Sequence, residues 1–297
     1  MTAYVEPRAV SGHTPAVPKG RGASTAFMRS SFKYVVLTAV ALLWLLPVIA
    51  ALITSFRTMD DIAIRGFWSL PKSLGMNNFQ RAWVDARVSK YLLNSFIITI
   101  PALFGMLFLS SLGAYALARY RFRGNLLLYF VFVAGTMLPF QILMLPVFRL
   151  TNRLGLYDSY GALILIHTAF QLGFCTFVLR NFMRSIPGEI IDAARVDGCG
   201  EFRIYWQIIL PLSLPALAAL ATLEFTWVFN DYLWAIILLR SDTLRPVTAG
   251  LATLRGQYNT DWPVITAGAL LATIPTLIVF VFLQRYFIQG LTLGSGK

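Results

Sequence analysis

Residues 34–55 read YVVLTAVALLWLLPVIAALITS and contain no charged side chain. An α-helix rises about 1.5 Å per residue, so roughly 20 apolar residues cross a hydrocarbon core of about 30 Å. The apolar core of a secretory signal peptide is shorter, at roughly 7–15 residues. The stretch therefore predicts a retained first transmembrane helix, kinked or locally adjusted at Pro47.

Five more apolar stretches of sufficient length follow it. The expected spans are about 33–55, 92–118, 126–149, 159–181, 210–239 and 264–288. The segment before them, 1–32, is rich in Pro, Gly and Ser and carries scattered basic residues, which predicts a disordered basic cytoplasmic tail. The expected fold class is an all-α membrane protein, with six transmembrane helices in one domain over 33–297.

The composition supports this fold class and excludes several others. Of the 297 residues, 57% are hydrophobic and 13% are charged, about half the roughly 25% of an average soluble domain. These values exclude a disordered, collagen-like or disulfide-rich secreted chain and leave an integral membrane protein, with membrane lipid as a partner. The net charge of +12 does not indicate nucleic-acid binding, because the basic residues stand singly between apolar runs.

The cysteines and histidines predict neither a disulfide nor a metal site. Cys175 lies in an apolar run and Cys199 in a polar loop, so the two are expected at different membrane depths and cannot pair. No Cys or His spacing matches a metal site. His167, inside an apolar stretch, is expected to be a hydrogen-bonded interior residue, and the alternative is a residue on a transport pathway.

The distribution of Lys and Arg predicts the orientation of the spans. The short segment Arg119-Tyr-Arg121-Phe-Arg123 is the densest basic spot in the chain, whereas the short loop 150–158 holds only Arg153 with Asp158. Short loops rich in Lys and Arg remain in the cytoplasm. We therefore expect both termini in the cytoplasm.

The polar segment 182–208 is far longer than a simple connector requires. Residues 189–196 are good helix formers with a charged face, and Asp197-Gly198 supplies a turn because glycine tolerates a positive φ. A second short helix then runs to Pro211. This helix–turn–helix predicts a docking surface for a soluble partner, and the alternative is an interfacial helix lying on lipid.

The residues of this segment also carry a family resemblance. They read Ile186-Pro187-Gly-Glu189-Ile-Ile-Asp192-Ala193-Ala194-Arg-Val-Asp197-Gly198, followed by Leu210-Pro211-Leu-Ser-Leu-Pro215. The pattern resembles the EAA loop of ABC importer permeases of the carbohydrate-uptake, maltose-permease type. Further similarity follows in order at Asn94-Ser95, Ala114-Tyr115-Ala116-Leu-Ala-Arg119, Pro139-Phe-Gln141, Asn230-Asp231-Tyr-Leu-Trp234 and Gln284-Arg285-Tyr-Phe-Ile-Gln-Gly290. Asp192, Cys199 and Phe229 depart from the residues usual in that family.

The resemblance implies a non-catalytic transport subunit in the plasma (inner) membrane of a bacterium or archaeon. The implied partners are a second related permease subunit, which completes the sugar or oligosaccharide pathway, two ATPase subunits that bind ATP and Mg, and an extracytoplasmic sugar-binding protein. The chain itself would hold no cofactor, and it contains no GxxxxGK[ST] motif.

Two sets of site residues follow from the resemblance. Those implied in ATPase docking are Glu189, Asp192, Ala193, Ala194, Asp197 and Gly198. Those implied in contact with the binding protein are Gly256, Gln257, Tyr258 and Asn259, where the alternative is a plain connector.

Charged side chains inside a membrane are costly and usually face a cavity or the bundle interior. Glu224 and Asp231 are seven residues apart, so one continuous helix would place them on one face with Trp227 between them. The candidate substrate pathway consists of Gln141, Glu224, Trp227, Asn230 and Asp231. Alternatively, these side chains hydrogen-bond neighbouring helices.

The sequence also leaves open a different class of protein. A proton-coupled secondary transporter or a membrane-embedded enzyme could use Glu224 and Asp231. An enzyme of this kind would need a nucleophile or metal set, and the sequence contains neither HExxH nor GxSxG. A secondary transporter often shows repeated halves, which the sequence lacks.

Overall fold

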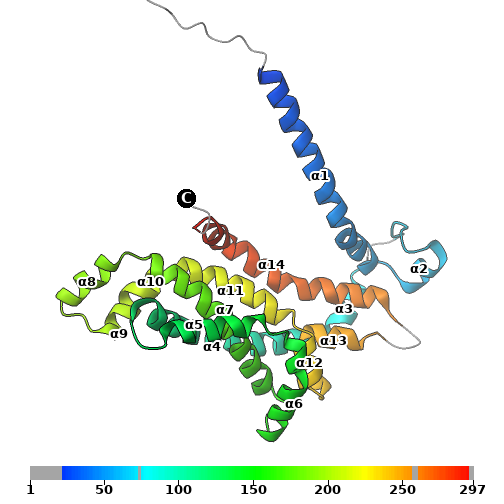
Figure 1. Ribbon diagram of the computed structural model, residues 1–297. Coiled ribbons are helices and arrows are strands. Elements are labelled where there is room, and N and C mark those ends of the chain that lie inside the picture. Colours follow the sequence, from blue (N-terminus) through cyan, green and yellow to red (C-terminus); the bar gives the residue numbers. More distant parts are fainter. Residues whose placement is uncertain (1–21, 73–74, 256–259, 294–297) are drawn as a thin grey trace, which may run out of the picture. The chain divides into compact units, whose positions relative to one another are not determined.

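The computed structural model is helical almost throughout (Figure 1). It describes the backbone of residues 22–72, 75–255 and 260–293, and the side chains of 31–72, 75–255 and 260–285. The chain divides into two compact units, residues 1–50 and residues 51–297, and the second unit contains every helix after α1.

The helices, in chain order, have the following bounds. They are α1 (Gly22–Ser55), α2 (Met59–Arg65), α3 (Asn77–Trp83), α4 (Val88–Arg119), α5 (Asn125–Met137), η1 (Phe140–Leu143), α6 (Met144–Arg153), α7 (Tyr160–Ser185), α8 (Gly188–Val196), α9 (Glu201–Ile204), η2 (Tyr205–Ile209), α10 (Leu210–Leu212), α11 (Leu214–Phe229), α12 (Leu233–Leu238), η3 (Asp242–Leu244), α13 (Val247–Thr253) and α14 (Trp262–Leu293).

Within the described residues, four helices are long and apolar enough to cross a membrane. They are α1 over Ser31–Ser55, α4, α7, and α14 over Trp262–Arg285. Two bent helix pairs raise the number to six if each pair counts as one span. The prediction of a multi-span helical protein is therefore confirmed, and six spans is the upper count.

The expected span over 126–149 corresponds to the first bent pair and is not one continuous helix. α5 ends at Met137, and the following helix, Phe140–Arg153, leaves at 90°. The physical reason is Pro139: a residue before proline is disfavoured in the α region, and Leu138 accordingly has ψ 126°. The proline thus turns the chain within this apolar stretch.

The expected span over 210–239 is also corrected. It contains three helices, α10, α11 and α12, and α11 ends at Phe229. Asn230 then closes α11 with its backbone N–H on Thr226 O, and the carboxylate of Asp231 accepts the backbone N–H of Ala235 at 3.3 Å. This side chain caps α12, so a new helix starts where a continuous one was expected.

The N-terminal boundary is corrected as well. α1 begins at Gly22, so residues 22–32 are helical and do not belong to a disordered tail. Proline is confined to the part of the tail up to Pro18, and the residues between Gly22 and the apolar stretch extend the helix at little cost once it has formed. Residues 1–21 lie outside the described range.

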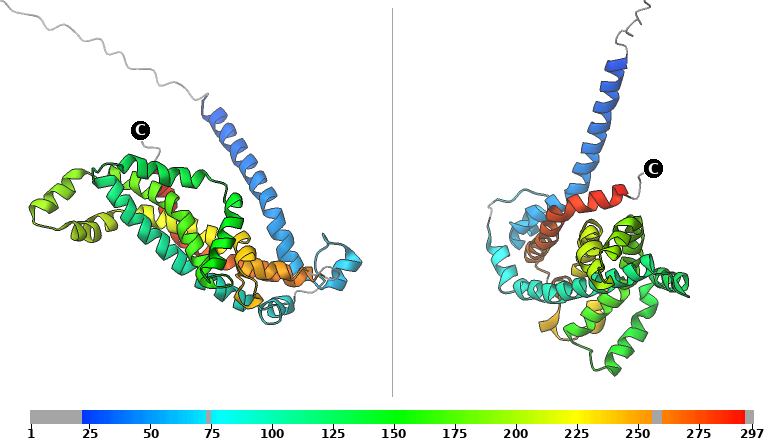
Figure 2. Two further views of the ribbon diagram at one scale, coloured as in Figure 1. Left: turned by 60° about the horizontal axis from the view of Figure 1, so that its bottom comes forward. Right: turned by 90° about the vertical axis from the view of Figure 1, so that its left-hand side faces the viewer.

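The main core lies between α4 and α7, which run side by side (Figure 1, Figure 2). Small residues allow this close approach: a Cβ on Gly105 would lie 3.2 Å from the Thr168 side chain, and one on Gly113 would lie 3.7 Å from Thr176. Fully buried Met106 and Leu179 fill the seam from the two helices. The packed pair forms the frame that positions the polar segment after α7.

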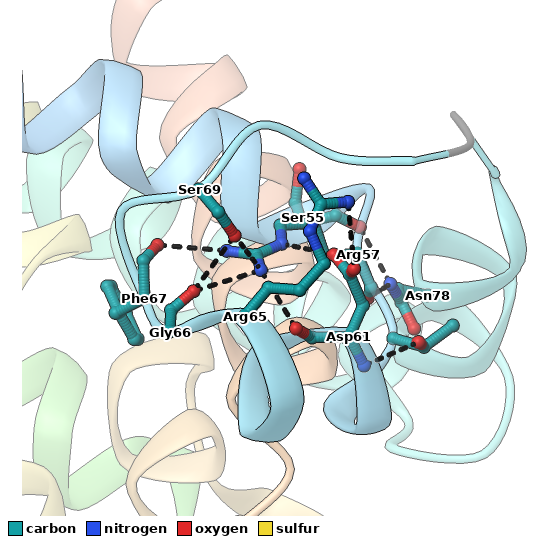
Figure 3. Close-up of polar contacts among 9 residues, drawn as sticks. Ser55, Arg57, Asp61, Arg65, Gly66, Phe67, Ser69 and Asn78 are labelled. Carbon is teal, nitrogen blue, oxygen red and sulfur yellow. Dashed lines mark hydrogen bonds and ion pairs between the residues drawn. The ribbon is translucent and has the colours of Figure 1, made fainter.

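The segment after α1 is organised around one buried cation, Arg57, whose side chain is 0% exposed (Figure 3). Its acceptors are the Asp61 carboxylate at 2.7 Å, Ser69 Oγ at 2.6 Å, and the main-chain oxygens of Asp61, Gly66 and Phe67 at 3.1, 3.0 and 2.9 Å. The guanidinium also holds the pKa of the Asp61 carboxyl below its usual range. Such complete pairing offsets the cost of burying a charge.

Asn78 of α3 closes the same cluster from the other side (Figure 3). Its Nδ2 donates to the main-chain oxygens of Ser55 and Arg57, both at 2.8 Å. A side-chain amide thus satisfies carbonyls that the end of α1 leaves without helical partners. The connection between α1 and α3 is therefore a folded element and not an open loop.

Candidate functional site

The polar segment after α7 forms the predicted helix–turn–helix. α8 and α9 project beyond the ends of α4 and α7 (Figure 1, Figure 2). Ile191 and Ala194 of α8 are buried, whereas the rest of the helix is exposed, including Ile190 and Val196 at 41% and 88%. An amphipathic helix with apolar side chains on its open face is suited to contact another protein.

The predicted docking residues divide between the two faces of this segment. Five of the six are exposed: Glu189, Asp192, Ala193, Asp197 and Gly198. Ala194 is buried at 7% exposure and packs into the main core. Ala194 therefore holds α8 in place, and the other five are available to a partner.

The turn after α8 has the geometry that its glycine predicts. Gly198 has φ 80°, in the left-handed region. Its backbone N–H donates to Arg195 O at 3.0 Å, and that of Cys199 donates to Ala194 O at 2.9 Å. These two bonds close the end of α8 in the way that a left-handed C-terminal cap does.

A polar cluster ties this turn to the end of α4. The Glu201 carboxylate accepts hydrogen bonds from the hydroxyls of Tyr115 and Tyr120, both at 2.8 Å, and from Arg195 Nε at 2.9 Å. Tyr115 is buried at 6% exposure. Glu201 thus connects α8, α9 and α4 through one side chain, and we call these four residues the Glu201 cluster.

Arg119 adds a second connection from the end of α4. Its guanidinium donates to the main-chain oxygens of Met183 and Ile186, the latter at 2.8 Å. These carbonyls belong to the end of α7 and the residue before Pro187. Sequence analysis identified Arg119 only as a charge that sets the orientation, and it did not identify Glu201, because no spacing rule pairs residues 86 positions apart.

The predicted pathway residues do not share one helix face. Glu224 of α11 is buried at 1% exposure beside Cys175 of α7, and its Oε2 has no hydrogen-bond partner among the described residues. Trp227, only three residues later, is 58% exposed. Asp231 lies beyond the end of α11, so the expected seven-residue helical spacing does not apply to it, and the prediction of a shared face is wrong.

Asp231 is instead held between three elements. It caps α12, its main-chain oxygen accepts a hydrogen bond from the Thr248 hydroxyl of α13, and its carboxylate lies 3.7 Å from His167 Nε2 of α7. His167 is buried, as expected of an interior residue. The other two predicted pathway residues, Asn230 and Gln141, are exposed.

The remaining predictions concern the contact with the binding protein and metal binding. The predicted contacts with the binding protein, Gly256, Gln257, Tyr258 and Asn259, lie outside the described residues. The flanking Arg255 and Thr260 form an isolated antiparallel β-bridge. In the described part of the chain, no group of three or more His, Cys, Asp or Glu side chains is arranged to hold a metal ion.

The chain is similar to known proteins of one family. Residues 106–293 match the family described as binding-protein-dependent transport system inner membrane component. A probable ABC transporter permease protein, YurM, of Bacillus subtilis is 35% identical over 266 residues, which cover 90% of this chain and 86% of the relative. The arabinooligosaccharides transport system permease protein AraQ of Halalkalibacterium halodurans is 36% identical over 261 residues, covering 87% and 93%.

A solved structure agrees over nearly the whole chain. A bacterial ABC transporter involved in the import of the acidic polysaccharide alginate superposes with a TM-score of 0.79 at 25% identity, covering 92% of this chain and 100% of that chain. These similarities favour a transport permease over a proton-coupled secondary transporter or a membrane-embedded enzyme. The chain belongs to the binding-protein-dependent inner membrane components of ABC importers, multi-pass membrane permeases whose named relatives include importers of oligosaccharides and polysaccharides.

Proposed function

We propose that the chain is one of two related permease subunits in an importer of a sugar or oligosaccharide. ATP and Mg bind to two separate ATPase subunits, this chain holds no cofactor and catalyses no reaction, and an extracytoplasmic sugar-binding protein delivers the substrate. The observation that carries the proposal is the exposed face of α8, clamped to the transmembrane core by the Glu201 cluster, in a chain of this family.

The orientation proposed places both termini in the cytoplasm. Each bent helix pair then counts as one span, which gives six spans. The support is the dense basic segment between α4 and α5, which lies at the same end of the bundle as α8. The membrane is the plasma (inner) membrane of a bacterium or archaeon, which the family's description as an inner membrane component supports.

In this proposal, ATPase closure moves α8 as a rigid body. Glu189, Asp192, Ala193, Asp197 and Gly198 contact the ATPase. The Glu201 cluster and Arg119 then pass the displacement to α4, and the tight α4–α7 seam carries it through the membrane. Because packed helices interdigitate, they transmit such a movement as a unit.

The proposal is tested by reconstitution. The chain is co-expressed with candidate partner subunits, purified through a tag on this chain, and reconstituted into proteoliposomes. Co-purification of an ATPase, and uptake of a labelled oligosaccharide that requires both ATP and the binding protein, is the expected result. Uptake driven by a proton gradient without any ATPase would overturn it.

Gly198→Val should disrupt coupling without blocking membrane insertion. Valine at a φ of 80° is strained by about 1–2 kcal/mol, and the space around Gly198 is open within this chain, so no clash with the rest of the fold adds to the strain on the turn. ATP-driven uptake should fall severalfold while the chain is inserted normally. The matched control is Gly200→Val, because Gly200 has φ −70° and is equally open. Equal uptake in the two variants would contradict the assignment.

For the substrate pathway we propose Gln141, Trp227 and Asn230 as exposed contacts, with Asp231 fixing the break that presents Asn230. Glu224 supports them from the buried side of α11. An aromatic ring together with amide groups provides a surface that suits sugar hydroxyls, which bind through stacking and hydrogen bonds.

Asp231→Ala should lower uptake severalfold while the complex stays assembled. The change removes the cap on α12, at a cost of about 1 kcal/mol. Asp231→Asn is the matched control, because asparagine caps a helix about as well as aspartate and keeps the shape of the side chain, so its uptake should stay within about twofold of the parent. Uptake and retained subunits are measured together, and normal uptake in Asp231→Ala would contradict the role.

A further inference from the structure

A basic pocket lies between the end of α4, the start of α5 and α7. Its volume is about 960 Å³, and it is lined over residues 117–127 and by Arg180 and Arg184. Five arginines line it: Arg119, Arg121, Arg123, Arg180 and Arg184. No Asp or Glu is among the lining residues. A pocket with this charge attracts an anion.

Two of the five arginines form a fixed floor. Arg180 is buried at 6% exposure, with its guanidinium 3.8 Å from the centre of the Tyr129 ring and its Nε on Leu117 O at 3.4 Å. Arg119 is held by the two carbonyls described above. A buried cation such as Arg180 costs free energy unless it is paired, and in the described part of the chain these two arginines pair with carbonyls and a ring, not with a carboxylate.

The other three arginines stand at the rim. Arg121, Arg123 and Arg184 are exposed, and no ion pair is recorded for them in the described part of the chain. The carboxylate that reaches this region, Glu201, is already occupied by Arg195 and by Tyr120, whose ring also lines the pocket. The positive charge of the rim is therefore available to a ligand.

The chemistry of the pocket selects a phosphate. Arginine forms paired, charge-assisted hydrogen bonds with phosphate oxygens, and arginines on several sides can hold a tetrahedral group. The pocket wall continues onto α5 as an apolar surface, with Leu126 and Leu127 at 59% and 70% exposure. A free phosphate ion would leave this surface bare, whereas a phospholipid would cover it with its acyl chains.

We propose that this pocket binds the phosphate headgroup of an anionic phospholipid, with the acyl chains along α5. The lipid would neutralise the arginine cluster at the point where the core meets the coupling segment. Basic pockets at the ends of membrane helices are sites of this chemical kind. The role assigned is binding, so it is independent of the sugar transported.

The test uses the assembled transporter purified in detergent and titrated with phosphatidylglycerol or phosphatidylcholine, with retained lipid counted by native mass spectrometry. Removal of two rim charges in the R121Q/R123Q variant should weaken phosphatidylglycerol retention about 25-fold, at about fivefold per arginine. The matched control is R149Q/R153Q, which removes the same charge from exposed positions on α6 that do not line the pocket.

Loss of phosphatidylglycerol in R121Q/R123Q alone, with phosphatidylcholine bound weakly by all three proteins, is the expected result. Equal retention in R121Q/R123Q and the parent would overturn the site. A further arm adds inorganic phosphate in large excess. Displacement of phosphatidylglycerol by phosphate alone would show a free-anion site and overturn the lipid assignment, and retention would support it.

Discussion

Arg57→Met should destabilise the segment between α1 and α3 by about 2–3 kcal/mol, because main-chain oxygens that accept hydrogen bonds from a charged group lose their donor. Methionine preserves most of the apolar stem but removes all five hydrogen bonds of the guanidinium. The Asp61 carboxylate, 13% exposed, and the oxygens of Gly66 and Phe67 would then be left without this donor. Amide hydrogen exchange over 56–72 in the purified transporter should rise sharply.

Arg65→Met is the matched control for this experiment. Arg65 pairs with the same carboxylate, Asp61, at 3.3 Å, but its side chain is 31% exposed. An exposed pair of this kind contributes about 0–1 kcal/mol, so exchange over the same amides should change little. If the two variants were equally mild, Arg57 would not organise the segment, and its burial would need another explanation.

Glu201→Ala should uncouple ATP hydrolysis from uptake. The change removes three hydrogen bonds at once and leaves the buried Tyr115 hydroxyl without an acceptor. A net loss of about 2–4 kcal/mol in the contact between the coupling segment and α4 follows from bonds to a charged group, discounted for its partial exposure. Basal ATP hydrolysis should continue, while uptake per ATP should fall by roughly tenfold or more.

A double-mutant cycle separates this role from general damage. Tyr115→Phe and Glu201→Ala are made singly and together, and uptake per ATP is measured for each. If the two side chains act through their hydrogen bond, the double variant should be no worse than Glu201→Ala alone. Fully additive losses would mean that the hydroxyl and the carboxylate act separately, and unchanged uptake in Glu201→Ala would remove the cluster from the mechanism.

The sequence predicted those parts of the fold that depend on local properties. The long apolar runs became α4, α7 and α14, because span length and hydropathy are sufficient to define a membrane helix. The helix–turn–helix was equally predictable. Its turn needs a residue with φ 80°, which glycine adopts without strain, and Gly198 stands at that position.

The bends escaped prediction for a different reason. Pro47 and Pro101 lie inside unbroken helices, whereas Pro139 marks a 90° turn, so proline alone does not determine the outcome. Neighbouring helices decide whether the freed backbone groups find partners. The break at Asn230 likewise depends on a capping bond from Asp231, which a hydropathy pattern does not register.

Sequence reasoning proposes site residues where they are contiguous, and it misses contacts that are assembled from distant segments. All six of the proposed docking residues lie in one stretch, from Glu189 to Gly198, and a family pattern covers them together. The Glu201 cluster joins α4 to α9 across 86 positions, and the arginine pocket joins α5 to α7. The prediction of one face shared by Glu224 and Asp231 is wrong, because it assumed a continuous helix, whereas α11 ends at Phe229.

The Arg57 cluster also has a consequence for biogenesis. All of its contacts join residues at most 23 positions apart, so it is complete once Asn78 has been synthesised and before α4 exists. Contacts of such short sequence separation form quickly. In the proposed orientation the cluster lies on the outer side of the membrane. Because a folded polar cluster is costly to move into lipid, it would hold the first helix in its transmembrane position while the remaining spans are inserted.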